Sequence, residues 1–214
     1  MPKVFLSAGH GGSDPGAVAY GMKEKDVNLS IMLTCNEVLV RHNVVTVLSR
    51  TKDENDSVSQ EAKEANASGA EIAVSFHTNA GGGDGSESLY YSSKGKQLAE
   101  LCEKHTLAIG QNSRGVKQRT GLHFLKATTM PSVICECAFI DNDNDNNIID
   151  TDKERKAFGV AYAKAILEYL KIPYKEDTKS YVVQVGTYKS KVNAENALKV
   201  AKSAGFKDAF IKTT

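Results

Sequence analysis

Short apolar runs alternate with amphipathic segments along the first 170 residues of the chain. Runs rich in apolar or β-branched residues predict strands at residues 4–8, 44–48, 71–76, 89–91, 122–126 and 132–137. Segments with helical periodicity or helix-forming composition predict helices at residues 26–42, 57–68, 97–109 and 151–170. This alternation predicts an α/β fold, with a mainly parallel, twisted sheet flanked by helices.

Polar residues and glycines mark the connections between these elements. Gly69 ends the second helix, and Thr151 with Glu154 predicts a capping box at the start of the last one. The Asn- and Asp-rich run at 141–147 is predicted to be a loop. The glycines at 81–85 lack the spacing of a phosphate-binding loop and are interpreted as a flexible rim of a site.

A second, smaller unit is predicted after Pro173. Residues 181–188, 193–204 and 205–211 form a β-α-β pattern. The predicted domains are therefore residues 1–172, a linker at 173–179 and a small C-terminal module at 180–214. A unit of this size rarely buries enough apolar surface to be stable alone.

The charge is distributed unevenly between these parts. Residues 180–214 hold six lysines against Glu195 and Asp208, a net of +4, while the other residues hold 21 basic and 24 acidic side chains, a net of −3, which together give +1. A basic module is expected to bind a polyanion, either a bacterial wall or nucleic acid. The module has few aromatic residues for base stacking, so nucleic acid is the weaker interpretation.

No apolar run is long enough for a membrane span, and the N-terminal run resembles a buried strand more than a signal peptide. We therefore expect synthesis in the cytoplasm without a signal peptide. The four cysteines form no zinc-knuckle pattern, so we expect them to be reduced and buried.

Three residues able to bind a metal or a proton stand at predicted strand ends: His10, His77 and Glu136. Sites of parallel sheets lie at the carboxyl ends of the strands, so we expect these side chains to converge. Catalytic zinc takes three ligands from His, Glu, Asp or Cys, and a further carboxylate can move protons. The spacing matches no short zinc signature, and a strand-end histidine more often caps a loop.

Five motifs change that balance. They lie, in order, at residues 4–17, 21–29, 74–80, 114–117 and 130–142, and they resemble motifs of the zinc-dependent N-acetylmuramoyl-L-alanine amidases, amidase type 3. The resemblance spans roughly residues 3–170. It departs from the family pattern at Ser7, where many relatives have Asp, and at Ala138, which replaces a common Gly.

The resemblance implies that His10, Glu24 and His77 bind Zn²⁺ and that Glu136 is catalytic. Without it, Glu24 would be interpreted as a first-turn acid that favours the helix dipole. The implied reaction is hydrolysis of the amide bond between N-acetylmuramic acid and L-alanine of the peptidoglycan stem peptide. A non-catalytic wall-binding protein and a zinc peptidase that cuts within the stem are the alternatives.

Other polar residues stay open at this point. Contact with substrate and a surface or loop role are equally good interpretations of three of them: Glu87, Asn79 and Arg114. The remaining histidines have no motif support and are interpreted as surface or core residues: His42, His105 and His123.

The C-terminal module resembles one half of a SPOR domain, a module associated with wall glycan. The resemblance implies binding of cell-wall glycan, and a homodimer through residues 180–214 or a longer natural chain would supply the other half. The expected setting is a phage endolysin or an autolysin that reaches the wall after membrane disruption, with peptidoglycan as partner and with neither nucleic-acid binding nor membrane insertion.

Overall fold

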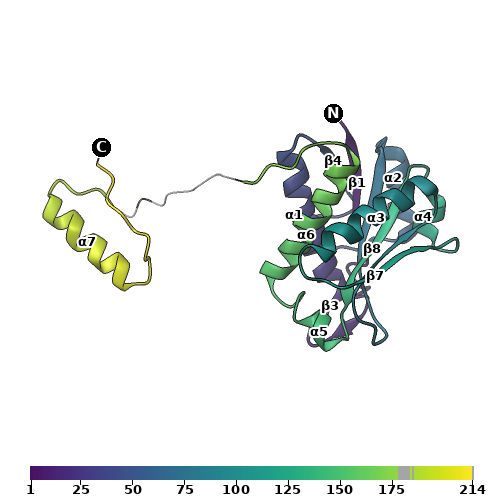
Figure 1. The fold of residues 1–214 in the computed structure, drawn as a ribbon, viewed down its shortest axis with the longest axis horizontal. Coiled ribbons are helices and arrows are strands. Elements are labelled where there is room, and N and C mark those ends of the chain that lie inside the picture. Colours follow the sequence, from purple (N-terminus) through teal and green to yellow (C-terminus); the bar gives the residue numbers. More distant parts are fainter. Residues whose placement is uncertain (178–183, 185, 214) are drawn as a thin grey trace. The chain divides into compact units, whose positions relative to one another are not determined.

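The computed structural model describes residues 1–177, 184 and 186–213, which divide into two compact units, Met1–Lys175 and Glu176–Thr214. The larger unit is built on one six-stranded sheet (Figure 1). Its strands, in spatial order, are β4 (Val45–Leu48), β1 (Lys3–Ala8), β5 (Ile72–Asn79), β8 (Ser132–Phe139), β6 (Ser86–Tyr90) and β7 (Ser113–Gln118). All neighbours are parallel except β6 and β8, so the predicted mainly parallel sheet is confirmed.

Helices cover both faces of this sheet because strand side chains alternate between the faces. Val4 and Leu6 of β1 point into the larger core, which is covered by α1 (Glu24–Arg41), α3 (Ser93–Leu107) and α6 (Asp152–Tyr169). Phe5 points into a smaller core, covered by α2 (Val58–Ser68) and α4 (His123–Ala127).

Several local signals act as predicted. The Ser57 side chain accepts the Gln60 N–H at the start of α2, and Gly69 ends this helix in the left-handed conformation. Thr151 and Glu154 form the predicted capping box of α6. The four cysteines are free and buried.

The predicted strand at 122–126 is wrong. These residues begin α4, whose N–H groups bond within the segment, as in Lys126 N–H to the Leu122 carbonyl, 3.0 Å. Consecutive Phe124 and Leu125 both enter the smaller core, which one helical turn permits and an alternating strand does not.

Two further elements differ from the sequence prediction. β7 was not predicted, because this edge strand contains one apolar side chain, Val116. The predicted loop at 141–147 contains a short helix, α5 (Asp143–Asn146), because the Asn142 side chain accepts the N–H groups of Asn144 and Asp145. A hairpin of β2 (Val18–Ala19) and β3 (Met22–Lys23) precedes α1.

The smaller unit contains α7 (Lys191–Ser203), close to the predicted helix. Half of the predicted strand at 181–188 (residues 181–183 and 185) lies outside the described residues, and residues 184 and 186–188 are in irregular backbone. Residues 205–211 form turns and irregular backbone in place of the predicted strand, since within the described residues no neighbouring strand pairs with them. Throughout the described ranges, no helix is long and apolar enough to cross a bilayer.

Candidate active site

The sheet brings the predicted site residues to one edge. His77 lies on β5 and Glu136 on β8, and the two are direct register partners. His10 follows β1 by two residues, and Glu24 is the first residue of α1. All four therefore meet at the carboxyl ends of adjacent parallel strands, where sites of such sheets occur.

Three of these side chains form a compact donor set. One donor atom from each of His10, Glu24 and His77 lies within 4.8 Å of the other two. Glu24 Oε1 is 3.2 Å from His10 Nε2 and 3.0 Å from His77 Nδ1. Two imidazoles and one carboxylate are a donor set that catalytic zinc sites use, with a fourth position left open.

Backbone amides hold Glu24 in this position. Glu24 Oε2 accepts the Ala17 N–H at 2.9 Å, and Oε1 accepts the Thr78 N–H at 3.1 Å. Asn28, one helical turn later, donates weakly to Oε1 at 3.4 Å and also to the Gly9 carbonyl at 3.0 Å. The carboxylate is thus oriented before any ligand binds.

His10 is oriented by Asp14, whose Oδ2 bonds Nδ1 at 2.8 Å and leaves Nε2 facing Glu24. A carboxylate behind a ligating imidazole fixes the ring and its tautomer. The carboxylate that orients His10 therefore comes from the loop that follows β1. The Ser7 side chain does not take this part, because it is buried within β1. His10 itself has φ +66°, a left-handed conformation that is uncommon for residues other than glycine.

A buried arginine fastens this loop to the sheet. Arg50 donates to the carbonyls of Ala8 (2.9 Å) and Lys25 (2.7 Å). The Lys25 ammonium in turn bonds the Gly12 carbonyl and the Asp53 carboxylate. Sequence reasoning missed both cations, because a lysine beside a helix start and an arginine after a strand are ordinary surface patterns.

The spacing between His77 and the first loop leaves no room for a side chain at Gly9. A Cβ there would lie 2.1 Å from His77 Cε1 and 2.2 Å from Nε2. Gly16 is similarly enclosed, since a Cβ there would lie 2.6 Å from Glu24 Oε2. The absence of a side chain at these two glycines of the first motif therefore leaves the space that the His77 and Glu24 side chains occupy.

The charges of the donor set are strongly coupled. Burial of Glu24 opposes its ionisation, but hydrogen bonds from His10 and His77 outweigh burial and lower its pKa. The bond to Glu24 raises the pKa of His10 to about 9, although burial acts in the opposite direction. The pKa of His77 is also raised, because Glu24 and Glu136 outweigh its burial.

The side chain of Glu136 differs from that of Glu24 in having no hydrogen bond to a described residue. Burial, with smaller contributions from Glu24 and Glu87, raises its pKa to about 7, although His77 acts against the shift. A carboxyl with a pKa near neutrality can both accept and donate a proton at physiological pH.

The residues left open by the sequence separate clearly. Glu87 pairs with Glu136 across β6 and β8, and it bonds Arg114 and Lys117. Asn79 instead accepts the neighbouring Ala80 N–H. The remaining histidines lie in other environments. His42 caps the end of α1, His105 bonds Glu168, and His123 is exposed at the start of α4.

The glycine loop at 81–85 is tied down by aspartates. Asp141 Oδ2 accepts the N–H groups of Gly81 and Gly82, and Asp145 Oδ2 accepts that of Gly85. These three hydrogen bonds hold the loop at 81–85, which the sequence predicted to be flexible, in a defined conformation.

The family model described as N-acetylmuramoyl-L-alanine amidase matches residues 4–168, more than half of the chain. The chain belongs to this family. As an amidase, it hydrolyses the bond between N-acetylmuramic acid and L-alanine in peptidoglycan and acts on the cell wall. A SPOR domain model matches residues 160–213, which supports a wall-binding C-terminal part.

Curated relatives match most of the chain. The amidase CwlM of Bacillus licheniformis is 32% identical, over 99% of this chain and 85% of its own length. The sporulation-specific amidase of Bacillus subtilis is 32% identical, over 96% and 83%. The endolysin of Bacillus phage SPP1 is 36% identical, over 83% and 72%.

Solved structures show the same fold. The catalytic domain of the amidase CwlV from Bacillus (Paenibacillus) polymyxa var. colistinus has a TM-score of 0.77 at 29% identity, covering 81% of this chain and 100% of that one. The amidase AmiC2 of Nostoc punctiforme has a TM-score of 0.76 at 29% identity, covering 79% and 97%.

Proposed function

We propose that His10, Glu24 and His77 bind one zinc ion and that Glu136 transfers the protons of amide hydrolysis. The observation that carries this proposal is the convergence of two imidazoles and a carboxylate within 4.8 Å, with an unbonded carboxyl in register beside them. When bound, zinc supplies Lewis-acid polarisation of a carbonyl and of water.

The residues of the chain carry out the remaining steps. Glu136 accepts a proton from the attacking water and then protonates the departing L-alanine amine. Both transfers use one carboxyl, whose raised pKa suits the two roles. Asp14 keeps His10 Nε2 directed at the metal position, and the amides of Ala17 and Thr78 keep Glu24 there.

The test is product analysis of purified peptidoglycan digested by zinc-loaded wild type and Glu136→Gln. Wild type should release new N-terminal L-alanine without new reducing sugar ends. We expect Glu136→Gln to retain one zinc per chain and to lose at least about 100-fold in turnover. Full turnover by this variant would remove Glu136 from the mechanism, and ends within the stem would indicate a peptidase.

We further propose that residues 180–214 bind wall glycan and pair with the same segment of a second chain. Within the described residues of this unit, large apolar side chains stay exposed: Val192, Val200, Phe206 and Phe210. Half of a two-part module is expected to leave such residues uncovered. Sedimentation equilibrium of the full chain tests the pairing; a monomer at all concentrations, with glycan binding intact, would contradict it.

The setting we propose is wall lysis after membrane disruption, as in an endolysin. One relative is an endolysin and another is specific to sporulation. Expression in a bacterium with and without a membrane-permeabilising agent tests this. Lysis should require the agent, and lysis without it would contradict the proposal.

A further inference from the structure

Two cations of β7 converge on one carboxylate beside the active site. Arg114 Nε donates to Glu87 Oε2 at 2.9 Å, and the Lys117 ammonium bonds the same oxygen. Arg114 and Lys117 are three positions apart, so in a regular strand their side chains would point to opposite faces. Something in β7 must change the alternation.

The cause is one extra residue in β7. Ser86 pairs with Ser113 and Ser88 pairs with Val116, so two residues of β7 lie opposite a single residue of β6. Gly115 has φ +81° at this position, a conformation that glycine adopts without strain. Bulges of this kind redirect side chains, and here the bulge turns both cations to the same side.

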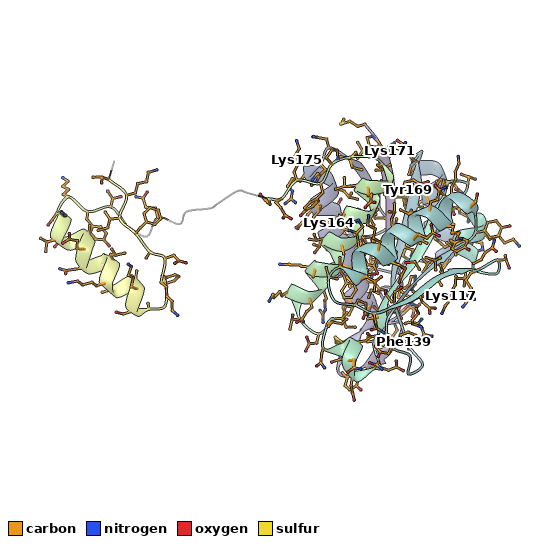
Figure 2. The ribbon with its side chains drawn as sticks, in the orientation of Figure 1. Lys117, Phe139, Lys164, Tyr169, Lys171 and Lys175 are labelled. Atoms are coloured by element: carbon orange, nitrogen blue, oxygen red, sulfur yellow. The ribbon has the colours of Figure 1, made fainter. Side chains whose placement is uncertain are left out.

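The side chains of Arg114 and Lys117 are held in place by Glu87 and are still accessible to solvent. The Glu87 side chain is 8% exposed, whereas those of Arg114 and Lys117 are 38% and 31% exposed. The Arg114 guanidinium lies 4.8 Å from the centre of the Phe139 ring, which orients it; Phe139 and Lys117 are labelled in Figure 2. Within the described residues, no further acceptor bonds the terminal nitrogens of Arg114.

The cluster is adjacent to the reacting groups. Glu87 pairs with Glu136, which pairs with His77, so all three side chains project from the same face of neighbouring strands. Burial opposes ionisation of Glu87, but hydrogen bonds from Lys117 and Arg114 outweigh it and lower its pKa. Glu87 therefore stays ionised and leaves one positive charge in surplus.

We propose that Arg114 and Lys117 form a subsite that binds a carboxylate of the stem peptide and so determines which stems are cleaved. N-acetylated sugars are neutral, so the peptide side of the scissile bond is the anionic part of the substrate. Arg114 can offer two terminal nitrogens to a carboxylate in a bidentate contact. The placement of this subsite beside the scissile bond rests on the proposed role of Glu136.

The stem peptide offers two carboxylates that this subsite could bind. One is an internal carboxylate on a residue after L-alanine, and the other is the C-terminal carboxylate. Three synthetic muramyl peptides separate them: both carboxylates free, the internal one amidated, or the terminal one amidated. We expect Arg114→Gln and Lys117→Gln to lower kcat/KM roughly 10- to 100-fold on the free substrate, mainly through KM. The loss should largely disappear on the peptide that is amidated at the recognised position.

Arg119→Gln is the matched control, because it removes an exposed cation just beyond β7. It should leave KM unchanged, and thermal unfolding checks that all variants fold. An equal loss on all three peptides would overturn the proposal in favour of a structural role. Glu136→Gln should lower kcat on all three peptides; normal turnover by that variant would instead refute the proposed catalytic role.

Discussion

At the scale of single residues, the site depends on contacts that leave very little space or freedom. Glu24 bonds two imidazoles and two backbone amides, and His77 lies directly against Gly9. The pairing in the sheet also places Glu87 next to Glu136. Changes of a methyl group or of one charge at these positions are therefore expected to have measurable effects.

Gly9→Ala should displace the His77 ring, because the new Cβ would lie 2.1 Å from Cε1. We expect zinc content and kcat to fall at least about 10-fold, together with a destabilisation of about 1–3 kcal/mol from overpacking. Zinc analysis and urea unfolding check this. Gly121→Ala is the control, since a Cβ there meets nothing within 4 Å; a normal zinc content in Gly9→Ala would contradict the model of the site.

Glu87 should make stability depend on pH in the acid range. Its folded pKa is lowered by Lys117 and Arg114 against the effect of burial, so its contribution is present above the unfolded value of about 4.3 and is lost as pH falls through the folded pKa. Wild type should exceed Glu87→Gln in stability at pH 7, and the difference should shrink below about pH 4. Urea unfolding at several pH values measures it; a difference that grows in acid would have the wrong sign.

At the scale of helices and strands, the sequence predicted the helix ends correctly but did not predict the edge strand β7. The capping box of α6 and the glycine stop of α2 were evident in the sequence, because caps act within one helical turn. The edge strand β7 was not, because its side chains are mostly polar and its pairing partner lies more than 20 residues away. Its bulge exists only through that pairing.

Thr151→Ala should destabilise the larger unit by about 1 kcal/mol, because the N-cap of α6 loses its side-chain acceptor. Urea unfolding of the full chain provides the measurement. Thr51→Ala, at an exposed position in a bend, should change stability by less than about 0.5 kcal/mol. Equal effects of the two changes would mean that the cap is unimportant.

At the scale of the whole molecule, the chain is two compact units with different chemistry. The proposed zinc ligands all belong to Met1–Lys175, and the exposed apolar residues of α7 belong to Glu176–Thr214. A ligand that binds only the folded form of one unit stabilises that unit by mass action. Zinc binding should therefore raise the free energy of unfolding of the unit Met1–Lys175 and leave that of Glu176–Thr214 unchanged.

Zinc at about 100 times its Kd should stabilise the larger unit by about 2.7 kcal/mol, and a chelator should reverse this. Differential scanning calorimetry of the full chain should show one zinc-dependent transition. In His77→Ala the dependence should vanish, whereas His123→Ala, at the exposed start of α4, should retain it. A zinc-dependent Tm in His77→Ala would exclude this donor set.

The sequence by itself determined the fold class, the order of most elements, the helix caps and the convergence of His10, His77 and Glu136 at strand ends. These follow from periodicity and from the general geometry of parallel sheets, which are local or generic properties. Glu24 came only from the family resemblance, because an acid in the first helical turn is common without a metal.

Only the tertiary structure decided how these groups face one another. Strand register places Glu136 between His77 and Glu87, and the bulge at Gly115 turns Arg114 and Lys117 toward the same carboxylate. The tertiary structure also showed that the predicted strand at 122–126 is the start of helix α4, since both Phe124 and Leu125 enter one core. Register, bulges and core contacts join residues that are distant along the chain, so local patterns carry no information about them.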